Sequence, residues 1–166
     1  AQETEVLEVL KGFHEKRFAY VQSSLNSAQA FSVNKAFDEA RGILESASTE
    51  CPDSLDLQNA LQELRVNETV QKVMAEVRNH LAEKKYDLAL ATLEGLLARY
   101  PEKTQIGQFH AEILQQRNAF IQESSQNARA LARDNDFDRA LGMLRTAADI
   151  VPNSVEIQDL IAEVGQ

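Results

Sequence analysis

The segment FDRALGMLRTAADIVP (137–152) decides how this chain folds, because the chain contains it three times in related forms. The other two copies are FDEARGILESASTECP (37–52) and YDLALATLEGLLARYP (86–101), and the three align without a gap. Each copy has an aromatic residue, Asp and Ala at its start, a Leu four residues after the Ala, and Pro at its end. The prolines lie 49 and 51 residues apart, which predicts a repeat protein with a period near 50.

The first and third copies also match outside this segment, at an offset of 100 residues. Upstream identities are Arg17, Ala19, Gln22, Ser24 and Ala28, which recur as Arg117, Ala119, Gln122, Ser124 and Ala128. Chance does not produce this many identities in one alignment. The repeat is therefore the strongest signal in the sequence.

The stretches between the copies have helical spacing. From Ser54 to Lys84 there is neither Gly nor Pro, and the apolar residues recur every three or four positions, which predicts one helix of about 30 residues. Long helices are predicted for 3–33, 54–84 and 104–133, short ones for 36–49, 86–99 and 136–150, and a last helix from Ser154. The expected fold is therefore all-α: antiparallel helical hairpins that alternate long helices (about 30 residues) with short ones (about 14).

The helix ends have physical causes. Pro52 and Pro101 follow the short helices and cannot continue them. Hydroxyl side chains that could cap the next helix are Ser54, Thr104 and Ser154. Asn34 and Asn135 lie in the opposite turns, where we expect a left-handed backbone.

Composition limits the function classes. The 166 residues are 43% hydrophobic and 26% charged, enough to build one domain with a core. The net charge of −9 repels phosphate and argues against nucleic-acid binding, and no apolar run approaches the roughly 20 residues of a membrane span. The single cysteine, Cys51, allows no internal disulfide; it is expected to be a small packing residue, and its lack of partners fits a cytoplasmic origin.

The repeated segment resembles the second half of a tetratricopeptide repeat, a family of helical hairpins. The matching positions are the aromatic-Asp-x-Ala start, Leu44, Leu93 and Leu144 four residues on, and the closing prolines. The small residue of the preceding helix corresponds to Ala28, Val77 and Ala128. The resemblance implies a solenoid that binds a protein or peptide on the concave face formed by the first helix of each hairpin.

Two departures from that family are visible. Its period is 34 residues rather than about 50, and the glycine usual between its two helices is missing here. We therefore expect a single repeat domain over 1–166, with units at about 21–69, 70–120 and 121–166 after a half-unit at 1–20. Because the chain starts inside a long helix and ends inside another, excision from a longer protein is expected, with a C-terminal capping helix as the alternative.

The missing short helix before residue 1 has a consequence for the first long helix. Val6, Leu10 and Phe13 share one face and would form an exposed apolar stripe.

Catalytic and metal motifs are absent from the sequence. It contains no phosphate loop, HExxH, GxSxG or CxxC motif, so we predict neither an enzyme nor a cofactor. The three histidines fall in different repeats without a ligand cluster, and His110 is expected to be a satisfied histidine at the core or its boundary. Asp134-Asn135-Asp136 imitates a calcium loop, but Arg139 and Arg145 replace the required Gly and Glu, which favours a polar turn.

Surface recognition is the remaining class of function. Family register would place one row of side chains from each long helix on the groove: Gln22, Leu25, Gln29 and Val33; Gln71, Met74, Arg78 and Ala82; Gln122, Ser125, Arg129 and Arg133. The candidate partner-binding residues are Gln22, Gln29, Gln71, Arg78, Gln122, Arg129 and Arg133. A solvated face that repeats only because the units were duplicated is the alternative. The family's carboxylate clamp is not expected, because Leu25 and Met74 replace its polar residues.

Arg129 and Arg133 form a local cationic spot, which would either grip an acidic peptide or pair with Asp134 or Asp136 in the adjoining turn. The sequence thus predicts a non-enzymatic scaffold for a protein or peptide. The alternative is a homo-oligomerisation module of a larger protein.

Overall fold

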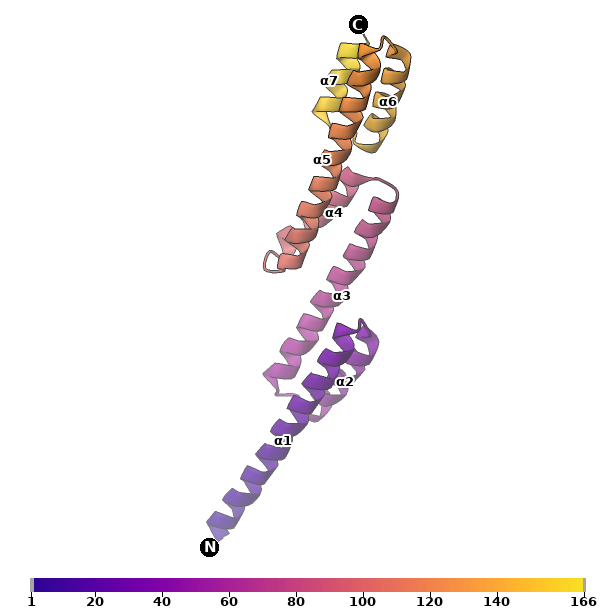
Figure 1. Ribbon diagram of the computed structural model, residues 1–166. Coiled ribbons are helices and arrows are strands. Elements are labelled where there is room, and N and C mark those ends of the chain that lie inside the picture. Colours follow the sequence, from indigo (N-terminus) through magenta and orange to yellow (C-terminus); the bar gives the residue numbers. More distant parts are fainter. Residues whose placement is uncertain (1, 166) are drawn as a thin grey trace. The chain divides into compact units, whose positions relative to one another are not determined.

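The computed structural model describes residues 2–165, which form seven helices and no strand (Figure 1). Three helices are long, α1 (Gln2–Val33), α3 (Leu55–Ala82) and α5 (Thr104–Arg133). The short ones are α2 (Phe37–Glu50), α4 (Tyr86–Arg99), α6 (Phe137–Ile150) and α7 (Val155–Val164). The predicted all-α class is confirmed, and the helix ends lie within two residues of those expected.

The predicted serine caps are present, whereas the threonine cap is wrong. The hydroxyl oxygens of Ser54 and Ser154 accept hydrogen bonds from the backbone N–H groups of Leu57 and Ile157, each at 3.4 Å. Thr104 is instead the first residue of α5, and Lys103 before it gives no side-chain cap. Both serines lie two residues after their proline, whereas Thr104 lies three after Pro101, so Lys103 occupies the cap position.

The turns after the long helices share one backbone geometry. Lys35, Lys84 and Asn135 have positive φ angles of 62°, 56° and 60°. In each turn the next residue's N–H bonds to a carbonyl five positions back, the Schellman arrangement that ends many helices. The expectation for Asn34 is therefore wrong by one residue, because register, rather than the tolerance of Asn for this conformation, sets which residue is left-handed.

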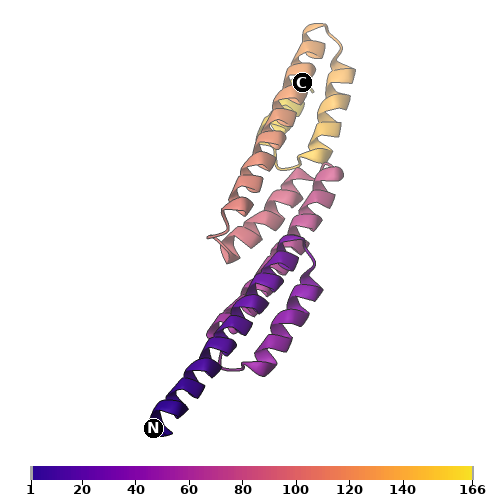
Figure 2. The same cartoon turned by 60° about the horizontal axis from the view of Figure 1, so that its bottom comes forward.

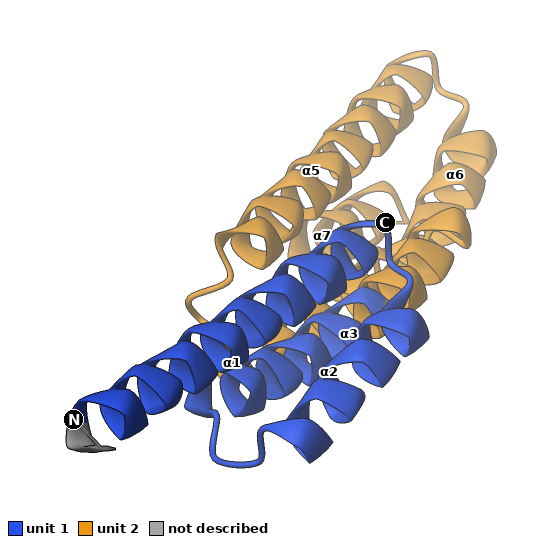
Figure 3. Cartoon of the chain, turned by 90° about the horizontal axis from the view of Figure 1, so that it is seen from below, with its two compact units in different colours: residues 1–71 blue, residues 72–166 orange. Residues whose placement is uncertain are grey.

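The chain divides into two compact units, 1–71 and 72–166 (Figure 3). The core of unit 1 packs the second half of α1 and all of α2 against the start of α3. Its buried residues are Val21, Ala28, Ala40, Leu44, Ala47, Cys51, Leu57 and Leu64. Cys51 is a buried free thiol within this core, as expected of a packing residue.

Unit 2 contains the end of α3 and the helices α4 to α7 (Figures 1 and 2). Ala89, Leu93 and Ala140 are fully buried, in agreement with the predicted register. The core around α5, α6 and α7 contains Ile121, Ala128, Leu144, Ala147, Val151, Ile157 and Leu160. The alanines at matching positions let neighbouring helices approach closely, which is how each hairpin excludes water.

Candidate interaction surface

The N-terminal half of α1 exposes large apolar side chains over about half of its circumference. We define its N-terminal apolar face as Val6, Leu7, Val9, Leu10, Phe13 and Phe18, which expose between 49% and 68% of their surface. Figure 1 shows this half of α1 extending past α2. The stripe expected for Val6, Leu10 and Phe13 is confirmed, and Leu7, Val9 and Phe18 widen it.

The equivalent half of α5 is covered, which shows what such a face does when a neighbour is present. Ile106 and Ile113, at the positions of Val6 and Phe13, are fully buried. Helix α4 lies along this half of α5 and contributes Asp87, which pairs with Arg117. The same repeat position is therefore part of a core in unit 2 and faces solvent in unit 1.

An ion pair fixes α4 on α5 in unit 2. The Arg117 Nε atom donates to Asp87 Oδ1 over 2.6 Å, and both side chains are more than four-fifths buried. The second carboxylate oxygen of Asp87 accepts the backbone N–H of Asn153 over 3.2 Å. One carboxylate thus connects α4, α5 and the turn before α7.

Unit 1 satisfies the matching arginine in another way. Arg17 pairs with Asp53, which occupies the position of Asn153. In unit 2 the carboxylate that pairs with the arginine of α5 comes from the preceding short helix, α4. In unit 1 the carboxylate that pairs with the arginine of α1 comes from the turn between α2 and α3. Arg17 needs no further carboxylate.

Unit 1 has a second polar contact between α2 and α3. Arg41 donates to Asp38 on its own helix and to Glu68 on α3. The hydrogen bond to Glu68, together with its charge, raises the pKa of Arg41 above its ordinary value. Glu68 occupies the position of Arg117, so Arg41 neutralises two acids that would otherwise face each other.

The predicted partner-binding residues divide between the units. Gln22 and Gln71 are half-buried and Gln29 is exposed, all in unit 1. In unit 2, Arg78, Gln122, Arg129 and Arg133 are exposed. Of this set the structure brings Gln122 and Arg129 to the same neighbour, Glu156.

Both repeated arginines already have contacts in unit 2. Arg129 lies 3.8 Å from Glu156 on α7, and the guanidinium carbon of Arg78 lies 5.8 Å from the centre of the Phe109 ring. The ion pair of Arg129 is therefore with Glu156 on α7, and in the adjoining turn Asp136 is bonded to Arg139 at 3.1 Å. Arg78 of α3 therefore contacts α5, and Arg129 of α5 contacts α7.

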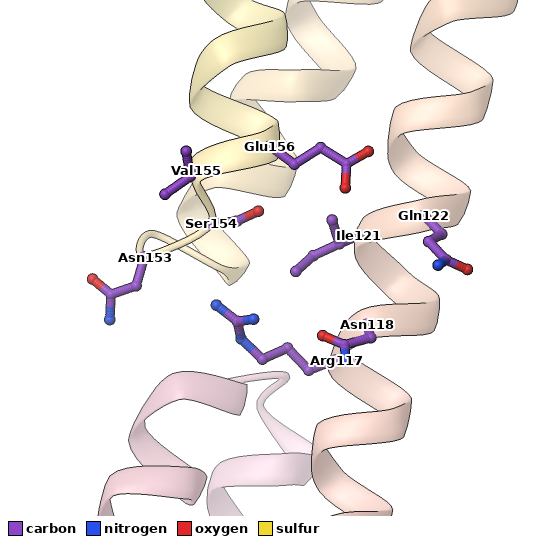
Figure 4. Close-up of a pocket in the computed structure, with 8 residues that line it drawn as sticks. All are labelled: Arg117, Asn118, Ile121, Gln122, Asn153, Ser154, Val155 and Glu156. Carbon is purple, nitrogen blue, oxygen red and sulfur yellow. The ribbon is translucent and has the colours of Figure 1, made fainter.

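Gln122 lines a small pocket beside the start of α7 (Figure 4). The pocket has a volume of about 250 Å³. Its lining is mostly polar: Arg117, Asn118, Ile121, Gln122, Asn153, Ser154, Val155 and Glu156. Because Asp87 already holds Arg117 and the Asn153 N–H, two of the pocket's donors are engaged.

Three expected groove residues do not line an open groove. Met74 and Ser125 are buried and Leu25 is half-buried, so the position they share belongs to the packing between helices. The Ser125 hydroxyl has no hydrogen-bond partner in the described residues. His110 is half-buried at the boundary, as predicted, but it is not satisfied: its Nε2 atom has no hydrogen bond and lies 3.6 Å from Glu94 Oε1.

Among residues 2–165, no group of three or more His, Cys, Asp or Glu side chains is arranged to hold a metal ion. Within the same residues, no helix combines the length and apolar character that crossing a bilayer requires. No protein-family model, curated protein sequence or solved structure matches the chain.

Proposed function

We propose that the chain is a non-enzymatic protein-interaction module, a tetratricopeptide-like scaffold of helical hairpins. Its docking surface is the N-terminal apolar face of α1. The observation that carries the proposal is the contrast between Phe13, 63% exposed, and its repeat equivalent Ile113, fully buried.

The composition of the face favours protein binding over chance exposure. Single exposed apolar side chains are normal, but contiguous apolar patches on a folded chain mark interaction sites. This face contains two phenylalanines, and aromatic side chains are enriched among the residues that dominate binding energy. All of these side chains lie on one continuous helix, α1, which presents them together to a partner.

The glutamine and arginine residues predicted from the family register support a binding role less strongly. Arg129 is engaged by Glu156 and Arg78 by Phe109, so an acidic peptide would have to displace existing contacts. Gln122 retains a polar pocket, which fits a peptide backbone as a secondary contact. We therefore propose α1 as the main docking site and the glutamine and arginine residues as a secondary one.

Affinity capture from a lysate of the source organism tests the proposed function. The baits are the unaltered chain, the double variant Leu7→Glu with Phe18→Glu, and a control, Leu55→Glu. Leu55 is 70% exposed at the start of α3, compared with 65% for Leu7, so the control places the same change at a similarly exposed site. We expect the unaltered chain and the control to retain proteins that the double variant loses. Identical sets for all three baits would contradict the proposal.

A further inference from the structure

We propose that a second copy of this chain occupies the N-terminal apolar face of α1, and that the two α1 helices pair antiparallel. This inference rests on the proposed function and names the partner at the same site.

A preceding helix of the α4 type fits the face poorly. Gly107 on α5 faces Leu97 on α4, and a Cβ atom built at Gly107 would already lie 3.9 Å from Leu97 Cδ2. The equivalent residue of α1 is Leu7, whose larger side chain would need that space. Asn118 is likewise replaced by Phe18, so the face on α1 is wider and bulkier than the one α4 covers.

Electrostatics also argue against an α4-type neighbour. Such a helix carries Asp at the position of Asp87, and it would bring that carboxylate to Arg17. Arg17 is already paired with Asp53, so a second carboxylate there would meet a like charge. The occupant should therefore present an apolar surface without an acid at that point.

The C-terminal hairpin of another copy is also unsuitable. In head-to-tail stacking, residues 4–13 of α1 from one copy would have to take the place that residues 155–164 occupy in the other copy. Helix α7 already packs there against α5 and α6, with Ile157 and Leu160 buried. Head-to-tail stacking would require α7 to leave its core.

A second α1 supplies such a surface. Apart from His14, the exposed side chains along the centre of the face are apolar, so two copies of it are complementary. Glu5 and Lys16 are exposed and eleven residues apart, which places them on the same edge of the face, beside Val9. An antiparallel pair brings Glu5 of one copy to Lys16 of the other, and two-fold symmetry forms this contact twice.

The other charges of this half-helix are compatible with the arrangement. Lys11 lies on the other edge, 4.0 Å from Glu15 on its own helix, and this pairing offsets the repulsion between the two copies of Lys11 near the axis. Glu8 points to the polar side, as helical spacing requires. The symmetry axis passes close to Leu10, and the rest of each unit 1 then lies at opposite ends of the pair.

Size-exclusion chromatography with light scattering on the full chain tests the inference, from about 1 μM to several hundred μM. We expect a mass that rises with concentration to that of two chains. Leu7→Glu should raise the dimer dissociation constant at least about 100-fold, because a charge enters the apolar contact twice, whereas Leu55→Glu should not change it. Lys16→Glu should weaken the dimer, and adding Glu5→Lys to it should restore the affinity. Circular dichroism checks that all variants remain helical.

The results separate the two proposals. A monomer at every concentration, together with capture of other proteins that depends on Leu7, would overturn the second-copy inference and leave the interaction function standing. A monomer together with capture that does not depend on Leu7 would overturn both. A dimer that Leu7→Glu leaves intact would place the contact elsewhere and overturn this inference.

Discussion

The alanine substitutions Ile113→Ala and Phe13→Ala probe one repeat position in its covered and uncovered settings. Ile113 is fully buried, and replacing a buried isoleucine by alanine costs about 2–5 kcal/mol through lost burial and the cavity left behind. We therefore expect Ile113→Ala to lower the free energy of unfolding by that amount.

Phe13 should behave differently because only about a third of its surface is covered by its own chain. A fully buried phenylalanine contributes about 1.5–3 kcal/mol, so the covered third contributes roughly 0.5–1 kcal/mol. Alanine is the better helix former on an exposed face and returns up to about 0.5 kcal/mol. The net loss for Phe13→Ala should stay below about 1 kcal/mol.

Urea denaturation followed by circular dichroism measures both values at about 1 μM, where we expect the chain to be monomeric. Ile106→Ala and Val6→Ala form a second matched pair, because Ile106 is also fully buried and Val6 is 57% exposed. A loss above about 2 kcal/mol for Phe13→Ala in the monomer would refute the reasoning, because it would mean that the chain covers this face itself. A loss below about 1 kcal/mol for Ile113→Ala would refute the repeat register.

Three further results are expected. Arg117→Ala should lower the free energy of unfolding by about 3 kcal/mol in urea denaturation, because it leaves the largely buried Asp87 carboxylate unpaired. Arg17→Ala should lower it by less than about 1 kcal/mol, because its partner Asp53 is mostly exposed. Equal losses would contradict this contrast. Lys84→Gly should stabilise the chain by about 0.5–1 kcal/mol, since a left-handed lysine is strained, and a lower melting temperature would contradict it. The hydrogen bond and charge of Lys85 lower the pKa of Glu83 below its ordinary 4.5. This pair therefore stabilises the fold above that pH, and the stabilisation is lost as the pH falls through the lowered pKa. In an NMR titration Lys85→Ala should raise the pKa of Glu83, and an unchanged pKa would contradict the assignment.

The helices were predictable because their causes are local. Helical spacing, the prolines and the serine caps set the ends of α2, α4 and α6 within one residue. The burial of Ala40 and Leu44 followed from the position of the repeated segment on a hairpin. The stripe on α1 was also predictable, since helical spacing places Val6, Leu10 and Phe13 on one face.

The misplaced expectations all depend on tertiary contacts or on register. The partner of Arg129 could not be read from neighbours in sequence, because Glu156 reaches it only when α7 packs beside α5. The left-handed residue is Lys35 rather than Asn34, because the turn's hydrogen bonds, rather than side-chain preference, select the position. Ser125 is polar in sequence but fully buried, since its position in the repeat faces the neighbouring helices.

Disulfide formation between copies tests the antiparallel α1 pair most directly, using Leu10→Cys and Phe18→Cys in the full chain. The native thiol, Cys51, is buried and does not compete. In the antiparallel pair the two residues 10 lie next to the axis, whereas the two residues 18 lie more than about 20 Å apart along it at 1.5 Å per residue, beyond the reach of a disulfide. We predict that mild oxidation converts the Leu10→Cys chain to a covalent dimer and leaves the Phe18→Cys chain monomeric. Rapid cross-linking of both variants would indicate a parallel pair, cross-linking of neither would indicate that the two faces do not meet, and either result would contradict the account.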